Sequence, residues 1–146
     1  FDFYEPLTVH ESSLSPCIHS ILASSLGYEA LAYKFYLRTA RLDLDDYNHD
    51  TDDGLHITSM AGTWMSVVEG FGGARVKQGQ LALAPALPKQ WQGYSFRICF
   101  RGALIKVAVQ EKSVILENES DVSLSLNLYG AEKTLPARQI LTVARN

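Results

Sequence analysis

The sequence predicts an α+β protein in which a helical first half precedes a small antiparallel β-sandwich. Apolar residues recur every three or four positions up to about residue 70, and they alternate with polar residues after Gly79. Gly, Asn, Asp and Ser separate the alternating segments, as in a series of hairpins. The change of period lies near residues 74–80, and we expect one domain over 1–76 and a second over 77–146.

Three helices are expected in the first half. Ser15 and Pro16 open the first of them, Ser15 as the N-cap and Pro16 at the first helical position, and Gly27 ends it. The segment 43–54 is rich in Asp and is expected to form a loop between the second and third helices. The expected helices cover about residues 14–26, 28–42 and 57–70.

The second half is expected to consist of short strands. The first is a stub that runs into a Pro-rich turn, and the others alternate with period two between turn residues. The expected strand segments are 81–93, 94–102, 103–112, 113–120, 122–130 and 138–146. One inward face is expected at Phe96, Ile98 and Phe100, and another at Leu104, Val107 and Val109.

Composition excludes several classes of partner. A net charge of -3 argues against a nucleic-acid or anionic-membrane surface, and no apolar run approaches the ~20 residues of a transmembrane helix. We also expect no signal peptide. Cys17 and Cys99 lie far apart in apolar surroundings, which favours buried free thiols in a reducing compartment, the cytoplasm, although one disulfide is the alternative.

Residues 53–64 ("DGLHITSMAGTW") place a histidine and two hydroxyl side chains where the third helix begins. A helix N-terminus exposes unpaired N–H groups and a partial positive charge, which suit a phosphate or carboxylate. His56, Thr58 and Ser59 can add side-chain donors to such an anion site. The alternative is a plain N-cap beside a buried, hydrogen-bonded histidine.

A second polar cluster, "HESSLS", precedes the first helix. His10, Glu11, Ser12 and Ser13 can line a substrate pocket, where Glu11 would hold a sugar hydroxyl or activate a water. The alternative is a loop whose serines bond their own backbone.

The remaining polar residues are not expected to bind metal. His19 lies within an apolar helix and is expected to be a hydrogen-bonded core histidine, and His49 is expected to be solvated. The aspartates of 43–53 lack the spacing and central glycine of an EF-hand loop. We therefore expect no metal site and no cofactor.

These segments resemble a known family. "FDFYEPLTVHESSLS" with "DGLHITSMAGTW", and "LALAPALPKQWQGYSFRICFRG" further along, are similar to the C-terminal part of glycoside hydrolase family 65, and most similar to its maltose phosphorylase type. The resemblance implies the last helices of an (α/α)6 catalytic barrel followed by the family's C-terminal β-sandwich. It also assigns His56, Thr58 and Ser59 to the phosphate site, and places the "HESSLS" loop at the same pocket.

The resemblance implies inverting phosphorolysis of an α-glucosidic disaccharide such as maltose, with inorganic phosphate as co-substrate. A general acid protonates the glycosidic oxygen while phosphate attacks the anomeric carbon from the opposite face. That glutamate, and a Lys-Gln pair that helps to hold phosphate, would precede Phe1, so no catalytic residue is expected here and the isolated chain should be inactive. An α-glucoside hydrolase with Glu11 as its base, or a non-catalytic structural module, are the alternatives.

The chain begins without methionine and in the middle of a pattern, which suggests a piece of a longer protein. Helices removed from a barrel keep apolar faces without partners, and such faces are usually covered by self-association. We therefore expect a homo-oligomer that forms through the helical half. The candidate residues for this face are Ile18, Leu22, Phe35, Met65 and Val68.

Overall fold

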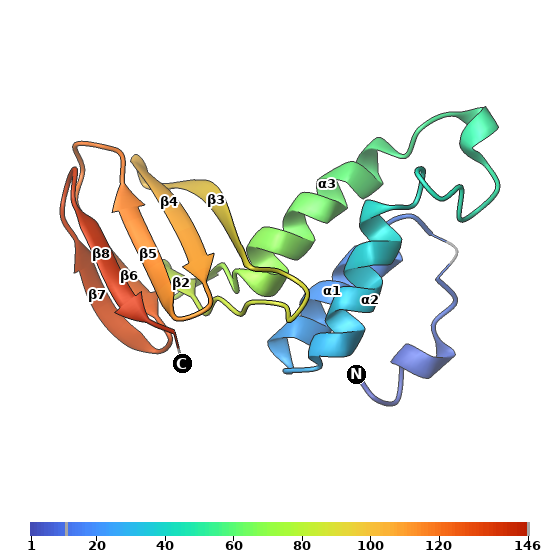
Figure 1. Ribbon diagram of the computed structural model, residues 1–146, viewed down its shortest axis with the longest axis horizontal. Coiled ribbons are helices and arrows are strands. Elements are labelled where there is room, and N and C mark those ends of the chain that lie inside the picture. Colours follow the sequence, from blue (N-terminus) through green and yellow to red (C-terminus); the bar gives the residue numbers. More distant parts are fainter. Residues whose placement is uncertain (11, 146) are drawn as a thin grey trace. The chain divides into compact units, whose positions relative to one another are not determined.

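The structure is a computed structural model that describes residues 1–10 and 12–145. It divides into two compact units, a helical one over Phe1–Phe71 and a β unit over Gly72–Asn146 (Figure 1). The expected α+β fold class is confirmed. The division falls at residues 71 and 72, whereas the sequence placed it after residue 76, inside the strand β1 (Arg75–Lys77).

The helical unit contains the three expected helices. The third changes after Met65 from α-helix to a π-helical turn, where the Ser66 hydroxyl donates to the Gly62 carbonyl (2.9 Å). Gly27, with a φ of +79°, ends the first helix as expected. The elements are η1 (Glu5–Leu7), α1 (Ser15–Ser25), α2 (Glu29–Ala40), η2 (Thr51–Asp53), α3 (Ile57–Met65) and η3 (Ser66–Phe71).

Ser15 does not cap α1, so that prediction was wrong. The N-cap position belongs to Leu14, and no side chain caps the helix. The Ser15 hydroxyl instead hydrogen-bonds His10 Nδ1 at 2.8 Å. The Ser15 side chain therefore contacts His10 instead of capping the helix.

Buried hydroxyl groups join the three helices. The Ser20 hydroxyl of α1 donates to the Ala32 carbonyl of α2 (2.9 Å), and the Ser59 hydroxyl of α3 donates to the Thr39 carbonyl of α2 (2.8 Å). Gly62 brings α3 against α1, since a Cβ at this position would lie 2.9 Å from Cys17 Cβ. Small and hydroxyl side chains thus set the spacing of the helices.

Replacing Gly62 with Ala is expected to destabilise the helical unit by about 1–3 kcal/mol, because the added methyl group overpacks the contact with Cys17. Gly70→Ala is the matched control, since its new Cβ would meet Ile21 at an ordinary 3.6 Å. Urea unfolding followed by circular dichroism measures both. Equal stability of the two variants would contradict close packing at Gly62.

The apolar surface of the helical unit differs from the expected one. Phe35 and Val68 are buried, so they cannot contribute to an exposed face, while Ile18 and Leu22 are each 45% exposed. Trp64 is also exposed, at 53%. Periodicity alone could not show which of two apolar faces packs on the neighbouring helices.

The β unit holds two four-stranded sheets, ordered β1-β2-β6-β7 and β3-β4-β5-β8. All neighbouring strands are antiparallel except β2 and β6, which pair in parallel through Leu81 and Leu126. The short polar strands β1 and β7 were not expected from the sequence. The remaining strands are β2 (Gln80–Leu83), β3 (Gly93–Phe100), β4 (Ala103–Gln110), β5 (Ser113–Asn118), β6 (Leu124–Leu128), β7 (Ala131–Leu135) and β8 (Ile140–Ala144).

Three hairpins of this unit turn through two residues with positive φ. Each turn consists of a larger residue followed by glycine, and positive φ at both positions is the geometry of a type I′ turn. Its twist matches that of the flanking strands, so the turns set the registers β1–β2, β3–β4 and β6–β7. The turns are Gln78–Gly79, Arg101–Gly102 and Tyr129–Gly130.

The core of the β unit comes from alternate residues of both sheets. Val107 and Val109 are buried as expected, but Leu104 is 37% exposed and lies on the opposite face of β4, because Ala103 and Ile105 take the inward positions. Both cysteines are free as expected, but only Cys17 is buried, and Cys99 is exposed. None of the described helices is long and apolar enough to cross a membrane.

Candidate functional site

His56 is held between two carboxylates at the start of α3. Its Nδ1 lies 2.6 Å from Asp43 Oδ1, and its backbone N–H donates to Asp43 Oδ2 at 2.9 Å. On the other side of the ring, Nε2 lies 3.4 Å from Asp50 Oδ2. Asp43 follows α2, so the acidic loop folds back and orients the imidazole.

The two partners shift each other's ionisation. The hydrogen bond to Asp43 raises the pKa of His56 above its ordinary 6.5, and Asp50 adds to this effect. The hydrogen bond from His56 lowers the pKa of Asp43 below its ordinary 3.8. The imidazole is therefore more readily protonated than a free histidine, and when it is protonated its second N–H points away from Asp43.

The stabilisation from this pair should have its maximum between about pH 3.8 and 6.5, the ordinary pKa values of Asp43 and His56. It is lost above this range as pH rises through the raised pKa of His56, and below it as pH falls through the lowered pKa of Asp43. Urea unfolding of the chain and of His56→Gln over a pH series measures the difference. A difference that keeps growing as pH rises past the His56 pKa would contradict the pairing.

Two other aspartates of the loop, Asp45 and Asp46, contact neighbouring residues. Asp46 Oδ1 accepts hydrogen bonds from the Thr51 N–H (3.2 Å) and hydroxyl (2.9 Å). Arg41 Nε donates to Asp45 Oδ2 at 2.7 Å. His49 is largely exposed, as expected, with Nδ1 3.7 Å from Asp46 Oδ2. These carboxylates are thus occupied by local partners.

The first turn of α3 carries the two predicted hydroxyl residues in different environments. Thr58 is exposed, and its Oγ1 lies 3.4 Å from Ser13 Oγ, so the two predicted polar segments meet there. Ser59 is buried and donates its hydroxyl proton to Thr39. The Thr58 side chain is therefore open to a ligand, while that of Ser59 holds α3 against α2.

The "HESSLS" residues separate into two groups. Ser13 faces Thr58, and the Ser12 hydroxyl accepts a bond from the Leu14 N–H (3.3 Å), which is a local turn contact. His10 turns toward α1 and α2, where its ring packs on Phe35 with centroids 4.8 Å apart. Glu11 lies outside the described residues.

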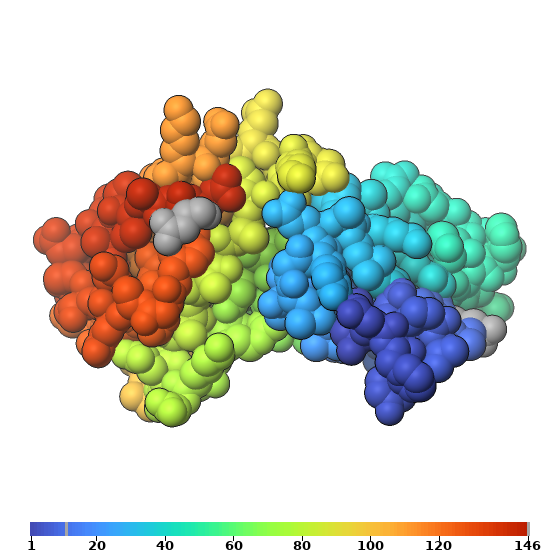
Figure 2. All heavy atoms as spheres, turned by 90° about the horizontal axis from the view of Figure 1, so that it is seen from below, coloured from blue at the N-terminus to red at the C-terminus, as the bar shows by residue number. Residues whose placement is uncertain are grey.

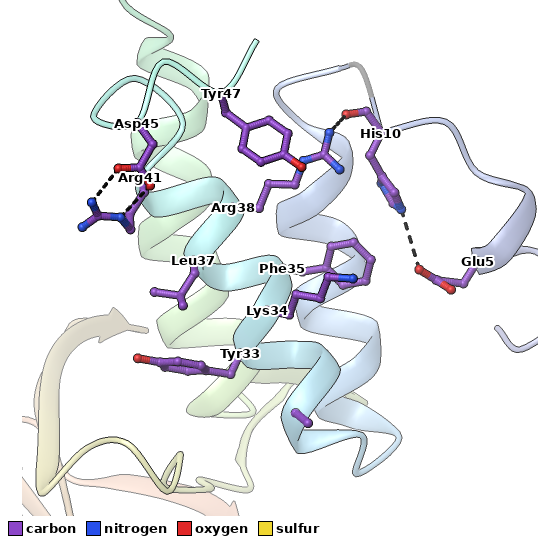
Figure 3. A pocket seen from close by; sticks show the side chains of 11 residues that line it. Glu5, His10, Tyr33, Lys34, Phe35, Leu37, Arg38, Arg41, Asp45 and Tyr47 are labelled. Atoms are coloured by element: carbon purple, nitrogen blue, oxygen red, sulfur yellow. Dashed lines mark hydrogen bonds and ion pairs between the residues drawn. The ribbon is translucent and has the colours of Figure 1, made fainter.

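A pocket of about 580 Å³ lies between the segment before α1 and one side of α2 (Figure 3). Arg38 spans it, donating to the His10 carbonyl oxygen while its guanidinium carbon lies 4.6 Å from the centre of the Tyr47 ring. His10 and Glu5 point toward each other at its edge (Figure 3). Cationic, aromatic and acidic groups thus line the same hollow.

Both units match models of known protein domains. Residues 1–65 match the model of the glycosyl hydrolase family 65 central catalytic domain, and residues 74–135 match that of the family's C-terminal domain. The chain belongs to glycosyl hydrolase family 65. The resemblance noticed in the sequence is confirmed.

Several similar proteins within family 65 are disaccharide phosphorylases by name. A maltose phosphorylase from Bacillus subtilis is 54% identical over 94% of this chain, and an α,α-trehalose phosphorylase from Thermoanaerobacter brockii is 51% identical over 79% of it. A solved structure of a protein proposed to be a kojibiose phosphorylase, from the human microbiome, matches 99% of the chain with a TM-score of 0.92 and 43% identity. The chain spans 18% and 15% of the two curated relatives, and 21% of the solved chain.

Sequence reasoning missed Asp43 as a residue of the candidate His56 site. Asp43 was expected only to be part of a loop, yet it orients His56 through both the ring and the backbone. No local pattern identifies it, because the two residues are 13 positions apart and the loop offers several equivalent aspartates.

Proposed function

We propose that this chain is the phosphate-side part of an inverting phosphorylase that cleaves an α-glucosidic disaccharide such as maltose. The observation that carries the proposal is that the chain is 54% identical to a maltose phosphorylase over 94% of its length. The partners would be the disaccharide and inorganic phosphate, with no further cofactor. The free thiols of Cys17 and Cys99 are compatible with the cytoplasmic location included in this proposal.

The reaction needs one protein acid and a bound nucleophile. The acid protonates the glycosidic oxygen, and a phosphate oxygen attacks the anomeric carbon from the opposite face, which gives glucose 1-phosphate with inverted configuration. Phosphate replaces the activated water of a hydrolase, so the enzyme must stabilise the charge of the phosphate with oriented donors. In this proposal the acid comes from another part of the enzyme.

His56, Thr58 and Ser59 are the proposed phosphate residues. Asp43 accepts from one side of the His56 ring, and the opposite Nε2–H, which lies 3.4 Å from Asp50, would donate a hydrogen bond to a phosphate oxygen instead. Thr58 would donate its exposed hydroxyl and its N–H, which has no acceptor among residues 1–10 and 12–145. Ser59 would contribute by positioning this turn, because its hydroxyl already donates to Thr39.

The "HESSLS" loop keeps a proposed place at the substrate pocket. Ser13 supports this role by its contact with Thr58. Ser12 is exposed beside it, and Glu11 is included from the sequence alone. His10 would not contact the substrate but would hold the loop in place, because its ring packs inward against Phe35.

The test compares a full-length enzyme that contains this chain with the isolated chain. With maltose, the full-length enzyme should form glucose 1-phosphate only when phosphate is present, and the isolated chain should form none. Release of free glucose without any dependence on phosphate would establish the hydrolase alternative. Turnover by the isolated chain that is lost in Glu11→Gln would place the acid in this chain.

The isolated chain should form a homodimer or larger oligomer through its helices. Ile18 and Leu22 on α1, together with Trp64 on α3, are exposed apolar side chains of the helical unit. Ile18→Glu with Leu22→Glu should therefore return the chain to a monomer in light scattering, whereas Leu44→Glu, at a 77% exposed site, should leave its mass unchanged. A strict monomer at high concentration would contradict the expectation.

A further inference from the structure

Three potential metal ligands meet where the N-terminal segment packs on α1. Glu5 of η1, His10 and His19 each offer one ligand atom, and these atoms all lie within 4.8 Å of one another. We call them the Glu5–His10–His19 cluster. None of the three belongs to the His56 site, and their spacing matches none of the common short zinc motifs.

Two nitrogen atoms in this cluster are buried without a hydrogen-bond partner. They are His10 Nε2 and His19 Nδ1, for which residues 1–10 and 12–145 provide no partner. Glu5 Oε1 lies 3.9 Å from His10 Nε2, which is beyond hydrogen-bond distance. A buried polar atom left unpaired is costly, so two of them in contacting rings require an explanation.

The contacts of His10 leave its Nε2, the nitrogen that faces the cluster, able to bind a metal ion. Its Nδ1 lies 2.8 Å from the Ser15 hydroxyl, and when Nδ1–H donates there, Nε2 presents its lone pair to the cluster. The His10 and His19 rings meet edge to face with centroids 4.5 Å apart, and both pack on Phe35. The ligands are thus held by second contacts and bounded by an aromatic wall.

We propose that the Glu5–His10–His19 cluster binds a divalent transition-metal ion of the zinc type. Two imidazole nitrogens and one carboxylate oxygen are a common three-ligand zinc set, and a water completes the tetrahedron. Movements of about 1 Å bring ligand atoms at these separations to zinc bonding distances. Lys34 and Arg38 line the adjoining pocket and oppose a cation, so the site binds more weakly than a zinc finger.

The ion would have a structural role. Glu5 and His10 belong to the segment before α1, which lies against the helices (Figure 2), and His19 is in the middle of α1. Metal binding therefore ties this segment to the helical unit. The inference uses no residue proposed to bind phosphate, and of its three residues only His10 also belongs to the proposed substrate loop. Its test measures metal binding and not phosphorolysis, so failure of one proposal can be distinguished from failure of the other.

The test uses the purified chain after treatment with a chelator. Calorimetry should show one Zn²⁺ bound per chain, Zn²⁺ should raise the melting temperature, and Co²⁺ should give the visible absorption of a tetrahedral site. His19→Gln and Glu5→Gln should each weaken Zn²⁺ binding by at least about tenfold. His49→Gln, at a largely exposed histidine, is the matched control and should bind as the parent does.

His10 is left unchanged because its ring also contacts the Ser15 hydroxyl, and circular dichroism checks that the two test variants are folded. The proposal is overturned if the chain shows no saturable Zn²⁺ binding, or if His19→Gln binds as tightly as the unchanged chain. Loss of binding in Asp43→Asn together with full binding in His19→Gln would assign the ion to the acidic loop, which also overturns it.

Discussion

His56→Asn in a full-length enzyme that contains this chain is expected to raise the KM for phosphate by about 10- to 100-fold, with the KM for the disaccharide nearly unchanged. The substitution removes a charged donor, and a hydrogen bond to a charged group contributes about 1.5–3 kcal/mol. Asp43 raises the pKa of His56, so Asp43→Asn should give a smaller loss in the same direction. Initial rates at varied phosphate and maltose concentrations measure both constants.

One control and two further variants separate an effect on phosphate binding from an effect on folding. His49→Asn changes an exposed histidine of the same loop and should leave both constants unchanged. Thr58→Val removes an exposed hydroxyl and should weaken phosphate use alone, whereas Ser59→Ala breaks the bond to Thr39 and should also lower stability. An equal rise in both constants for His56→Asn would return residues 56–59 to the role of a plain helix start.

Asn118→Leu is expected to destabilise the β unit by about 3–5 kcal/mol, the largest stability effect predicted for the chain. Asn118 is buried on β5, and its Nδ2 donates to the carbonyl oxygens of Val122 (2.8 Å) and Pro136 (3.1 Å). Its Oδ1 accepts from the hydroxyl of Ser120 (2.6 Å). Leucine has the same branched shape but cannot form hydrogen bonds, so it leaves these polar groups unpaired.

The matched control for this substitution is Asn127→Leu. Asn127 accepts one exposed hydrogen bond, from the Gly130 N–H at 2.8 Å, so its loss should cost about 1 kcal/mol or less. Urea unfolding monitored by tryptophan fluorescence gives both values. If the two variants are equally stable, the Asn118 network adds nothing beyond packing.

The sequence predicted the long elements better than the short polar ones. Helical and alternating periods located α1, α2 and α3 and most strands, because these segments have one clearly apolar face. Strand β7 is mostly exposed and contains Glu132 and Lys133, so it shows no apolar alternation, and only its pairing with β6 makes it a strand. Leu104 misled the choice of face because the small Ala103 takes the buried position.

The candidate site was predictable in its residue types but not in its contacts. His56, Thr58 and Ser13 were identified from their positions at or near the starts of helices, and the structure brings Thr58 and Ser13 together. Which hydroxyl turns inward depends on tertiary packing, as with Ser59 and Thr39. The pairing of His56 with Asp43 likewise requires knowledge of how the acidic loop folds back.

The three type I′ turns have a consequence for the order of folding. Each joins strands that are neighbours in the chain, so these hairpins close over short loops on a microsecond timescale. The parallel pairing of Leu81 with Leu126 instead has to bring together residues separated by the whole of β3, β4 and β5. Closing this long loop costs chain entropy before the contact can stabilise it. We therefore expect β2–β6 docking, and not hairpin formation, to limit the folding rate of the β unit.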